Sequence, residues 1–132
     1  MIFRNIVEKD VPKLYEGWTE KDNYSIEELE TYIKNHGETS FLVEDGEKTI
    51  AGILAGHDGL NGYIHHIQVE ESYRKNGVGE KLLDCAVKSL MQKGIKNCHV
   101  LIDGSDTLNR RYWVRKGFER QDSVYMYSKN LD

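Results

Sequence analysis

The stretch that decides the fold runs from residue 63 to residue 91 and reads YIHHIQVEESYRKNGVGEKLLDCAVKSLM. It opens with a β-type run over residues 63–69, followed by an acidic turn and a basic, glycine-bearing segment over residues 74–79. Apolar residues then recur at positions 78, 82, 83, 86, 87 and 90, a spacing that predicts an amphipathic helix. The sequence therefore predicts a strand, a glycine loop and a helix in direct succession.

This order of elements predicts an anion site at the start of the helix. The first four amides of a helix lack internal partners, and the aligned peptide dipoles favour negative charge there. Gly77 and Gly79 have no Cβ, so an oxyanion can approach the backbone closely. Asn76 suits the N-cap position, and Arg74 and Lys75 add positive charge at the rim. We expect the ligand to be a phosphate or a pyrophosphate.

The spacing of the glycines narrows the choice of phosphate ligand. The P-loop pattern GxxxxGK[ST] is absent, and Leu82 stands where the dinucleotide-binding pattern GxGxxG needs its third glycine. Residues 74–79 instead fit the pattern [RQ]xxGx[GA], and an apolar-x-Val triplet at residues 67–69 ends the preceding strand. Together these features resemble the acyl-CoA pyrophosphate loop of the GNAT acetyltransferase superfamily.

The rest of the chain predicts the element order β-α-α-β-β-β-α-β-α-β, in which Asp10 begins a short helix and Ser25 opens another with a capping box. Strands are expected at residues 2–7, 40–44, 49–56, 63–69, 98–103 and 124–128, with a further short strand around residues 119–121, and the last helix runs from Ser105 or Asp106 to residue 116. We expect a single α/β (α+β) domain over residues 1–132. Its sheet would be mixed and mostly antiparallel, with about six to seven strands and about four helices on its two faces.

A second marker lies near the C-terminus, at residues 109–118, which read NRRYWVRKGF. It resembles the C-terminal signature of the GNAT superfamily, an Asn followed by an aromatic pair and then by Gly-Phe. The turn AGHDGLNG at residues 55–62 also resembles a small bacterial subgroup of these acetyltransferases. The order of elements agrees with the GNAT acyl-CoA N-acyltransferase fold, and the resemblance covers essentially the whole chain.

The bulk composition excludes several other classes. The net charge is −4, which gives a nucleic-acid partner no electrostatic support. The N-terminus does not read as a signal peptide, and no apolar run approaches the length of a membrane span, so we expect no membrane partner and a cytoplasmic location. Cys85 and Cys98 are expected to be buried free thiols, and no Cys/His cluster predicts a metal site.

The resemblance implies that acetyl-CoA is the co-substrate and that it lies between the strand at residues 63–69 and the next strand. Its pantetheine arm would pair with the backbone of Ile67 and Val69, its pyrophosphate would sit on the glycine loop, and Asn109 would reach toward it. The acetyl group would pass directly to an amine, with the backbone amide of Ile67 as oxyanion donor. The residues implied for the co-substrate are Ile67, Gln68, Val69, Arg74, Lys75, Asn76, Gly77, Val78, Gly79, Glu80, Asn109 and Trp113.

A general base is needed because a protonated amine cannot attack a thioester. The family often carries this group four or six residues before the last Val of the strand, which implies His65 or Tyr63 here. We favour His65, since an imidazole with a pKa of about 6.5 suits base chemistry near neutrality. Strand alternation would put Tyr63, His65, Ile67 and Val69 on one face. His66 is the alternative, because a β-bulge would exchange the faces.

The general acid is less determined, because Trp113 stands where the family usually has Tyr. Tyr112 is its neighbour, and Tyr125, Tyr127 or water are the other options. The acceptor side is expected to include four loop residues whose aromatic or carboxylate groups suit a cationic amine: Trp18, Glu20, Tyr24 and Asp58.

The function implied by these features is acetyl-CoA-dependent N-acetylation of a primary amine, on a small molecule or a protein, by a monomer or a homodimer. A non-catalytic acyl-CoA-binding module of the same fold is the alternative, and Trp113 is its main support. A nucleotide-phosphate binder that shares the loop by chance is a third reading, and the signature at residues 109–118 argues against it.

Overall fold

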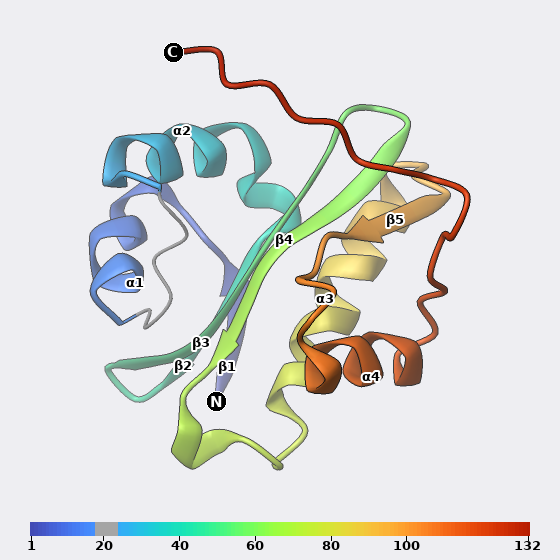
Figure 1. Ribbon diagram of the computed structural model, residues 1–132. Coiled ribbons are helices and arrows are strands. Elements are labelled where there is room, and N and C mark those ends of the chain that lie inside the picture. The colour runs from blue at the N-terminus through green and yellow to red at the C-terminus, as the bar shows by residue number, and fades with distance from the viewer. Residues whose placement is uncertain (18–23) are drawn as a thin grey trace. The chain divides into compact units, whose positions relative to one another are not determined.

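The computed structural model describes residues 1–17 and 24–132 (Figure 1). These residues form two compact units, Met1–Val100 and Leu101–Asp132, which we describe separately. The first unit holds a five-stranded sheet in which the strands follow one another in the order of the sequence. The strands are β1 (Ile2–Asn5), β2 (Phe41–Asp45), β3 (Lys48–His57), β4 (Asn61–Val69) and β5 (Asn97–Val100).

The directions of the strands agree with the predicted mixed sheet. The strands β1 to β4 pair as antiparallel neighbours, and β5 runs parallel to β4. The helix α3 (Val78–Gln92) is the crossover that this parallel pair requires. The loop in front of α3 therefore lies at the end of β4, as the sequence predicts.

The first unit also holds α1 (Val11–Gly17) and α2 (Ile26–His36), together with the short 3₁₀ helices Glu8–Asp10, Gly37–Thr39 and Glu71–Tyr73. The predicted capping box at the start of α2 is confirmed, since Glu28 N–H donates to Ser25 Oγ and Ser25 N–H donates to Glu28 Oε1. The helices α1 and α2 cover one face of the sheet, and α3 covers the other (Figure 1). In the described part of the chain, no helix is both long and apolar enough to cross a membrane.

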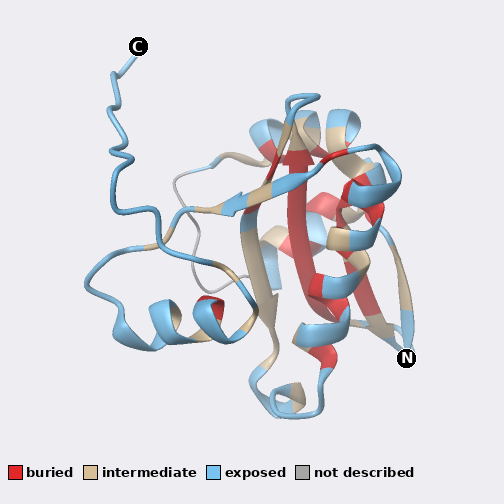
Figure 2. Ribbon diagram, turned by 90° about the vertical axis from the view of Figure 1, so that its right-hand side faces the viewer, coloured by how far each residue is buried: buried red, intermediate tan, exposed pale blue. Residues whose placement is uncertain are grey.

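Each face of the sheet carries its own apolar core (Figure 2). On the side of α1 and α2, the core consists of Ile6, Val11, Leu14, Leu29, Ile33, Leu42 and Leu54. On the other side, α3 contributes the buried residues Val78, Leu82, Leu83, Ala86, Ser89 and Leu90. Cys85 and Cys98 are free thiols, but both are half-buried rather than buried as expected. The strand β3 lies between the two cores and contacts both α2 and α3.

The second unit consists of α4 (Thr107–Arg115) and the segment that follows it. Asp106 caps the helix by accepting from Asn109 N–H at 3.0 Å, which decides between the two predicted caps. The helix ends in a Schellman motif, in which Gly117 has φ 91° and the N–H of Phe118 donates to the carbonyl oxygen of Trp113.

The sequence prediction fails after α4, because residues 118–132 contain no strand. The strands predicted at residues 124–128 and 119–121 are therefore wrong, and the sheet formed by the described residues has five strands rather than six or seven. A strand needs a ladder partner as well as residues that favour extended backbone, and the side chains here are exposed, with Tyr127 at 93%.

Candidate active site

The loop before α3 has a backbone shape that favours anion binding. Lys75 and Gly77 both have positive φ, at 73° and 76°, with Asn76 between them. The N-cap of α3 is Gly77 in the left-handed conformation, not Asn76 as predicted, because glycine adopts this conformation without a steric cost. Successive amides in such a turn point to one side, and the first amides of α3 continue that row.

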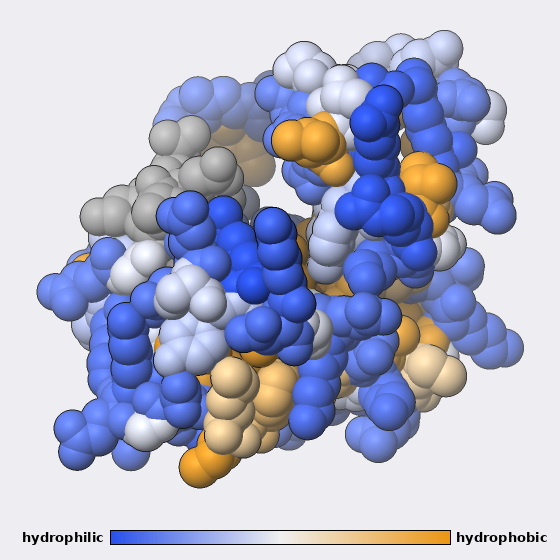
Figure 3. Space-filling model, turned by 90° about the horizontal axis from the view of Figure 1, so that it is seen from below, coloured by the Kyte–Doolittle hydropathy of each residue, from blue (hydrophilic) through white to orange (hydrophobic). Residues whose placement is uncertain are grey.

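The loop is exposed but tied to the structure at both ends. Arg74 Nε donates to the carbonyl oxygen of Val69 at 3.0 Å, so its guanidinium holds the loop against the end of β4. A Cβ added at Gly79 would lie 3.4 Å from Val69 Cγ2, which shows how closely the helix approaches the strand. The surface seen from this end of the structure is largely hydrophilic (Figure 3). The loop thus offers fixed backbone donors at a polar surface.

The second part of the candidate site, besides the loop before α3, lies around a β-bulge in β4. Leu54 of β3 pairs with His66, whereas the next residue of β3, Ala55, pairs with Ile64. His65 is therefore the extra residue of the bulge and has no partner on β3. The predicted alternative, a bulge in this strand, is the arrangement that the structure shows.

The bulge changes which side chains share a face. Leu54 belongs to the core on the α1 and α2 side, so its partner His66 faces that side. Tyr32 and His65 pack ring against ring at 5.3 Å between centroids, so His65 faces the same side from the bulge. Val69 instead faces the start of α3. The expected common face of Tyr63, His65, Ile67 and Val69 is therefore wrong: Ile67 and Val69 lie on the α3 side.

His66 and His65 have different surroundings although both face α1 and α2. His66 Nε2 lies 3.4 Å from Gln68 Oε1, and Gln68 Nε2 donates to the carbonyl oxygen of Gly17 at 3.5 Å, so this pair points to the end of α1. His65 lies against Tyr32 of α2, and Tyr63 is its neighbour at 6.3 Å between ring centroids. Both histidines stay candidates by position.

His65 has the electrostatic setting that a base requires. Desolvation by the surrounding protein lowers the pKa of its imidazole below the ordinary value, which keeps the ring neutral near pH 7. The residue as a whole is nevertheless exposed. The direction of the shift reflects loss of water around the ring and not a neighbouring charge.

Four residues that the sequence analysis missed lie near His65 or its neighbours: Tyr32, His36, His57 and His99. Tyr32 and His36 lie one turn apart on α2 with ring centroids 4.9 Å apart, and His57 at the end of β3 lies 5.8 Å from His36. We call the whole group the histidine–tyrosine cluster; it comprises Tyr32, His36, His57, Tyr63, His65 and His99. The only sequence signal was the spacing of four residues between Tyr32 and His36, which puts them on one helix face.

Two imidazoles of the cluster, those of His36 and His65, have lowered pKa values. Burial and the nearby His57 and His65 lower the pKa of His36. His57 Nδ1 accepts from Gly59 N–H at 3.0 Å, which puts the proton of the neutral ring on Nε2. Within the described residues, no group of three or more His, Cys, Asp or Glu residues is arranged to hold a metal ion.

The structure describes two of the four predicted acceptor residues, Tyr24 and Asp58. Trp18 and Glu20 lie outside the described residues. Tyr24 is 44% exposed and directly precedes the Ser25 cap of α2. Asp58 uses Oδ1 to accept from two N–H groups of its own turn, and these backbone bonds lower the pKa of its carboxyl. Its carboxylate is thus engaged in shaping the turn, and its role toward an acceptor stays a prediction.

The predicted residues of α4 pair with one another. Trp113 Nε1 donates to Asn109 Oδ1 at 2.9 Å, and the indole is buried, 5.0 Å from the Phe118 ring between centroids. Tyr112 packs at 5.1 Å from Trp113 and under the ammonium group of Lys116. The indole therefore packs in the unit and orients Asn109. Their hydrogen bond uses Oδ1 of Asn109 and does not involve its Nδ2 group. The roles of these residues toward acetyl-CoA stay predictions.

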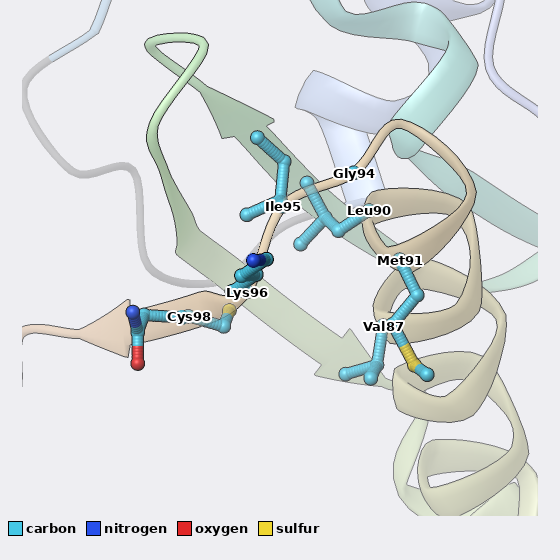
Figure 4. Close-up of a pocket in the computed structure, with 8 residues that line it drawn as sticks. Val87, Leu90, Met91, Gly94, Ile95, Lys96 and Cys98 are labelled. Atoms are coloured by element: carbon cyan, nitrogen blue, oxygen red, sulfur yellow. The ribbon is translucent and has the colours of Figure 1, made fainter.

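One apolar pocket of about 500 Å³ lies at the other end of α3 (Figure 4). Its lining comes from the last turns of α3 and the chain that leads into β5: Val87, Leu90, Met91, Gly94, Ile95, Lys96, Asn97 and Cys98. A helix of 15 residues is about 22 Å long, so this pocket is far from the loop at the start of α3. It shares no residue with either half of the candidate site.

Known proteins share both the sequence pattern and the fold described above. The family model for the acetyltransferase (GNAT) domain matches residues 7–129. A protein described as acetyltransferase SG1711, from Sodalis glossinidius (strain morsitans), is 28% identical over 98 residues, which are 74% of this chain and 69% of that protein.

Two solved structures show the same fold at low identity. Ard1 from Thermoplasma volcanium has a TM-score of 0.79 at 16% identity, over 89% of this chain and 82% of that one. AAC(6')-Iy, in complex with the bisubstrate analogue CoA-S-monomethyl-acetylneamine, has a TM-score of 0.72 at 17% identity, over 98% of both chains. Because the family model spans nearly the whole sequence, the chain belongs to the GNAT family of acetyltransferases.

Proposed function

We propose that this protein is an acetyl-CoA-dependent N-acetyltransferase that transfers the acetyl group directly to a primary amine. The observation that carries the proposal is the pairing, on one strand, of two features: an anion-binding loop at the end of β4 and a neutral, accessible histidine in its bulge. The loop lies at the α3 side and the histidine at the α2 side, so that co-substrate and acceptor can approach β4 from different directions.

The loop residues fit the pyrophosphate of acetyl-CoA. A Cβ added at Gly77 would meet no atom within 4 Å, so the space above the turn is open to a ligand. The backbone donors of residues 75–80 are the proposed contacts, and Lys75 adds a positive charge. Arg74 acts mainly through its bond to Val69, which keeps the turn in place. Residues Ile67, Gln68 and Val69 are the proposed backbone partners of the pantetheine arm.

His65 is the proposed general base. The neutral amine attacks the carbonyl carbon of the thioester, the amine proton passes to the imidazole, and the C–S bond breaks as thiolate leaves. The lowered pKa of His65 keeps its nitrogen free to accept that proton at neutral pH. The backbone amide of Ile67 is the proposed donor to the oxyanion. His66 is the second candidate base, and Tyr63 the third.

Protonation of the leaving thiolate is the less demanding step. A thiol with a pKa of about 8.5 leaves readily as thiolate. The indole of Trp113 already donates to Asn109 and has no readily transferable proton, so it serves no acid role. Tyr112 stays the proposed acid, with Tyr125, Tyr127 and water as the alternatives.

The acceptor is proposed to be a primary amine on a small molecule or a protein. The complex of AAC(6')-Iy with CoA-S-monomethyl-acetylneamine supports the proposal, because it joins CoA to an amine-bearing molecule in the same fold. Tyr24, which directly precedes the Ser25 cap of α2, is proposed to contact the acceptor, together with Trp18, Glu20 and Asp58. A screen of amines identifies which acceptor the protein uses.

The test is thiol release from acetyl-CoA across a panel of amines, with mass spectrometry of the products. We expect sustained release and an acetylated product with at least one amine. His65→Gln should lower kcat by about 10²-fold or more at pH 7, whereas the matched variant His66→Gln should lower it much less. Equal loss in both variants would contradict the assignment of the base. Binding of CoA without release from any amine would favour the non-catalytic acyl-CoA-binding module.

A further inference from the structure

Tyr32 occupies a central place in the histidine–tyrosine cluster. It lies in the middle of α2, where its ring packs on His36 at 4.9 Å and edge-on to His65 at 5.3 Å, with an interplanar angle of 81°. Its hydroxyl lies over the backbone of Gly56 in β3, since a Cβ there would be only 2.5 Å from Tyr32 Oη. The ring is thus fixed between the helix, the strand and the bulge.

We propose that Tyr32 is a positioning residue for the transfer reaction: its ring holds the imidazole of His65 in one orientation above the β-bulge. This inference rests on the proposed function, in which His65 takes the proton of the amine. Tyr32 itself forms no bond with the substrate in this scheme. It acts only through His65.

The bulge explains why His65 needs such a support. A bulged residue has no cross-strand neighbour to restrict its side chain, and His65 is the residue that no β3 position pairs with. An exposed side chain in that position loses rotamer freedom only when another group packs against it. The ring of Tyr32 is the packing partner at the shortest centroid distance, with Tyr63 farther away at 6.3 Å.

The hydroxyl of Tyr32 is not the active part. It is buried and has no hydrogen-bond partner within the described residues, as is also true of His36 Nδ1. Burial raises the pKa of Tyr32, so the phenol stays protonated and takes no proton from His65. The proton that His65 accepts from the amine therefore leaves to water from the exposed side of the imidazole. The ring, not the hydroxyl, is the part of Tyr32 that the reaction uses.

The charges around His65 support the same role. Among the described residues, the titratable groups that face it or its neighbours are Tyr32 and His36 from α2, Tyr24 just before α2, His57 from β3, Tyr63 and His66 from β4, and His99 from β5. None of these is a carboxylate, and the pKa of His65 falls through desolvation alone. Removing the Tyr32 ring would return water to the imidazole, so the pKa of His65 should move back toward its ordinary value.

The test compares Tyr32→Phe, which keeps the ring, with Tyr32→Leu, which removes it but keeps an apolar side chain. The pKa of His65 is read by NMR titration of its imidazole protons, which requires no acceptor. We expect Tyr32→Phe to titrate as the wild type does and Tyr32→Leu to titrate at a higher pH. Tyr15→Leu is the matched control, because Tyr15 packs on the same core from α1, and it should leave the titration unchanged.

Steady-state kinetics with an amine that the protein acetylates provide a second test of the role of Tyr32. Tyr32→Leu should lower kcat by about 10- to 100-fold, with the acid limb of the pH profile moved to higher pH and the KM for acetyl-CoA unchanged. Circular dichroism at each pH establishes that the variants are folded.

A His65 titration in Tyr32→Leu equal to that of the wild type would overturn the proposal. So would an equal change in Tyr32→Phe and Tyr32→Leu, which would transfer the role to the hydroxyl. If the wild type acetylates no amine, the proposed function fails, while the titration still decides whether Tyr32 holds His65.

Discussion

A single methyl group added at Gly56 should disturb the packing on which the histidine–tyrosine cluster depends. An ideal Cβ at this position would lie 2.5 Å from Tyr32 Oη, 2.9 Å from His36 Cγ and 3.1 Å from His36 Nδ1. All three atoms belong to rigid rings on α2, so a small rotation cannot relieve the contacts. Either the rings or the helix must move when Gly56 becomes Ala.

The size of the effect follows from two opposing contributions. Overpacking of a filled interior costs about 1–3 kcal/mol. Replacing glycine by alanine also restricts the unfolded chain, which offsets about 0.4–1 kcal/mol of that cost. We expect Gly56→Ala to lower the free energy of unfolding by about 0.5–2 kcal/mol. At about 4 °C for each kcal/mol in a domain of this size, the Tm should fall by about 2–8 °C.

Thermal unfolding followed by circular dichroism measures this change. Gly104→Ala is the matched control, because a Cβ there would meet no atom within 4 Å, and its Tm should stay within about 2 °C of the wild type. In a Tyr32→Phe background the closest contact is removed, so Gly56→Ala should cost at least about 0.5 kcal/mol less there. An effect of Gly56→Ala no larger than that of the control, or one unchanged by Tyr32→Phe, would refute the reasoning.

Three further predictions concern other parts of the structure. Ser25→Ala removes the side-chain cap of α2 and should lower the free energy of unfolding by about 0.5–2 kcal/mol in urea denaturation, and an unchanged midpoint would contradict the cap. The pKa values of His36 and His65 are lower in the folded protein than in the unfolded chain, so the unfolded chain takes up protons first as the pH falls. The stability that these two neutral imidazoles contribute is complete above about pH 6.5 and is lost as the pH falls toward their folded pKa values. The Tm should therefore drop between about pH 7.5 and pH 5.5, and the drop should be smaller in His36→Asn. Trp113→Phe removes the bond to Asn109 and should cost about 1–2 kcal/mol by the same denaturation assay, whereas a loss below about 0.3 kcal/mol would show that the bond contributes nothing.

The parts of the fold that depend on local chemistry follow from the sequence. The Ser25–Glu28 capping box and the glycine loop before α3 are confirmed because each is fixed within a few residues of the chain. The N-cap of α3 is Gly77 and not the predicted Asn76. The N-cap position here has the left-handed conformation, which glycine adopts without a steric cost.

The parts that depend on pairing between distant segments do not follow from the sequence. The bulge at His65 arises from the register between β3 and β4, and it puts Ile67 on the opposite face from His65, with which it was predicted to share a face. The strand predicted at residues 124–128 consists mostly of apolar and aromatic residues, but these residues form no ladder in the structure. Tyr32 meets His65 only because α2 packs on β3, and a spacing along α2 does not reveal that contact.

The most direct test of the central claim is a calorimetric titration of CoA into the protein and into two glycine variants. Gly77→Ala and Gly46→Ala both put a methyl group on a residue with positive φ and open space around it, so their strain is matched. We predict that Gly46→Ala binds CoA as the wild type does, that Gly77→Ala binds at least about tenfold more weakly, and that pantetheine, which lacks the pyrophosphate, binds weakly to all three. Failure of the wild type to bind CoA, or equal binding by the two variants, would contradict the assignment of the loop before α3 as the pyrophosphate site.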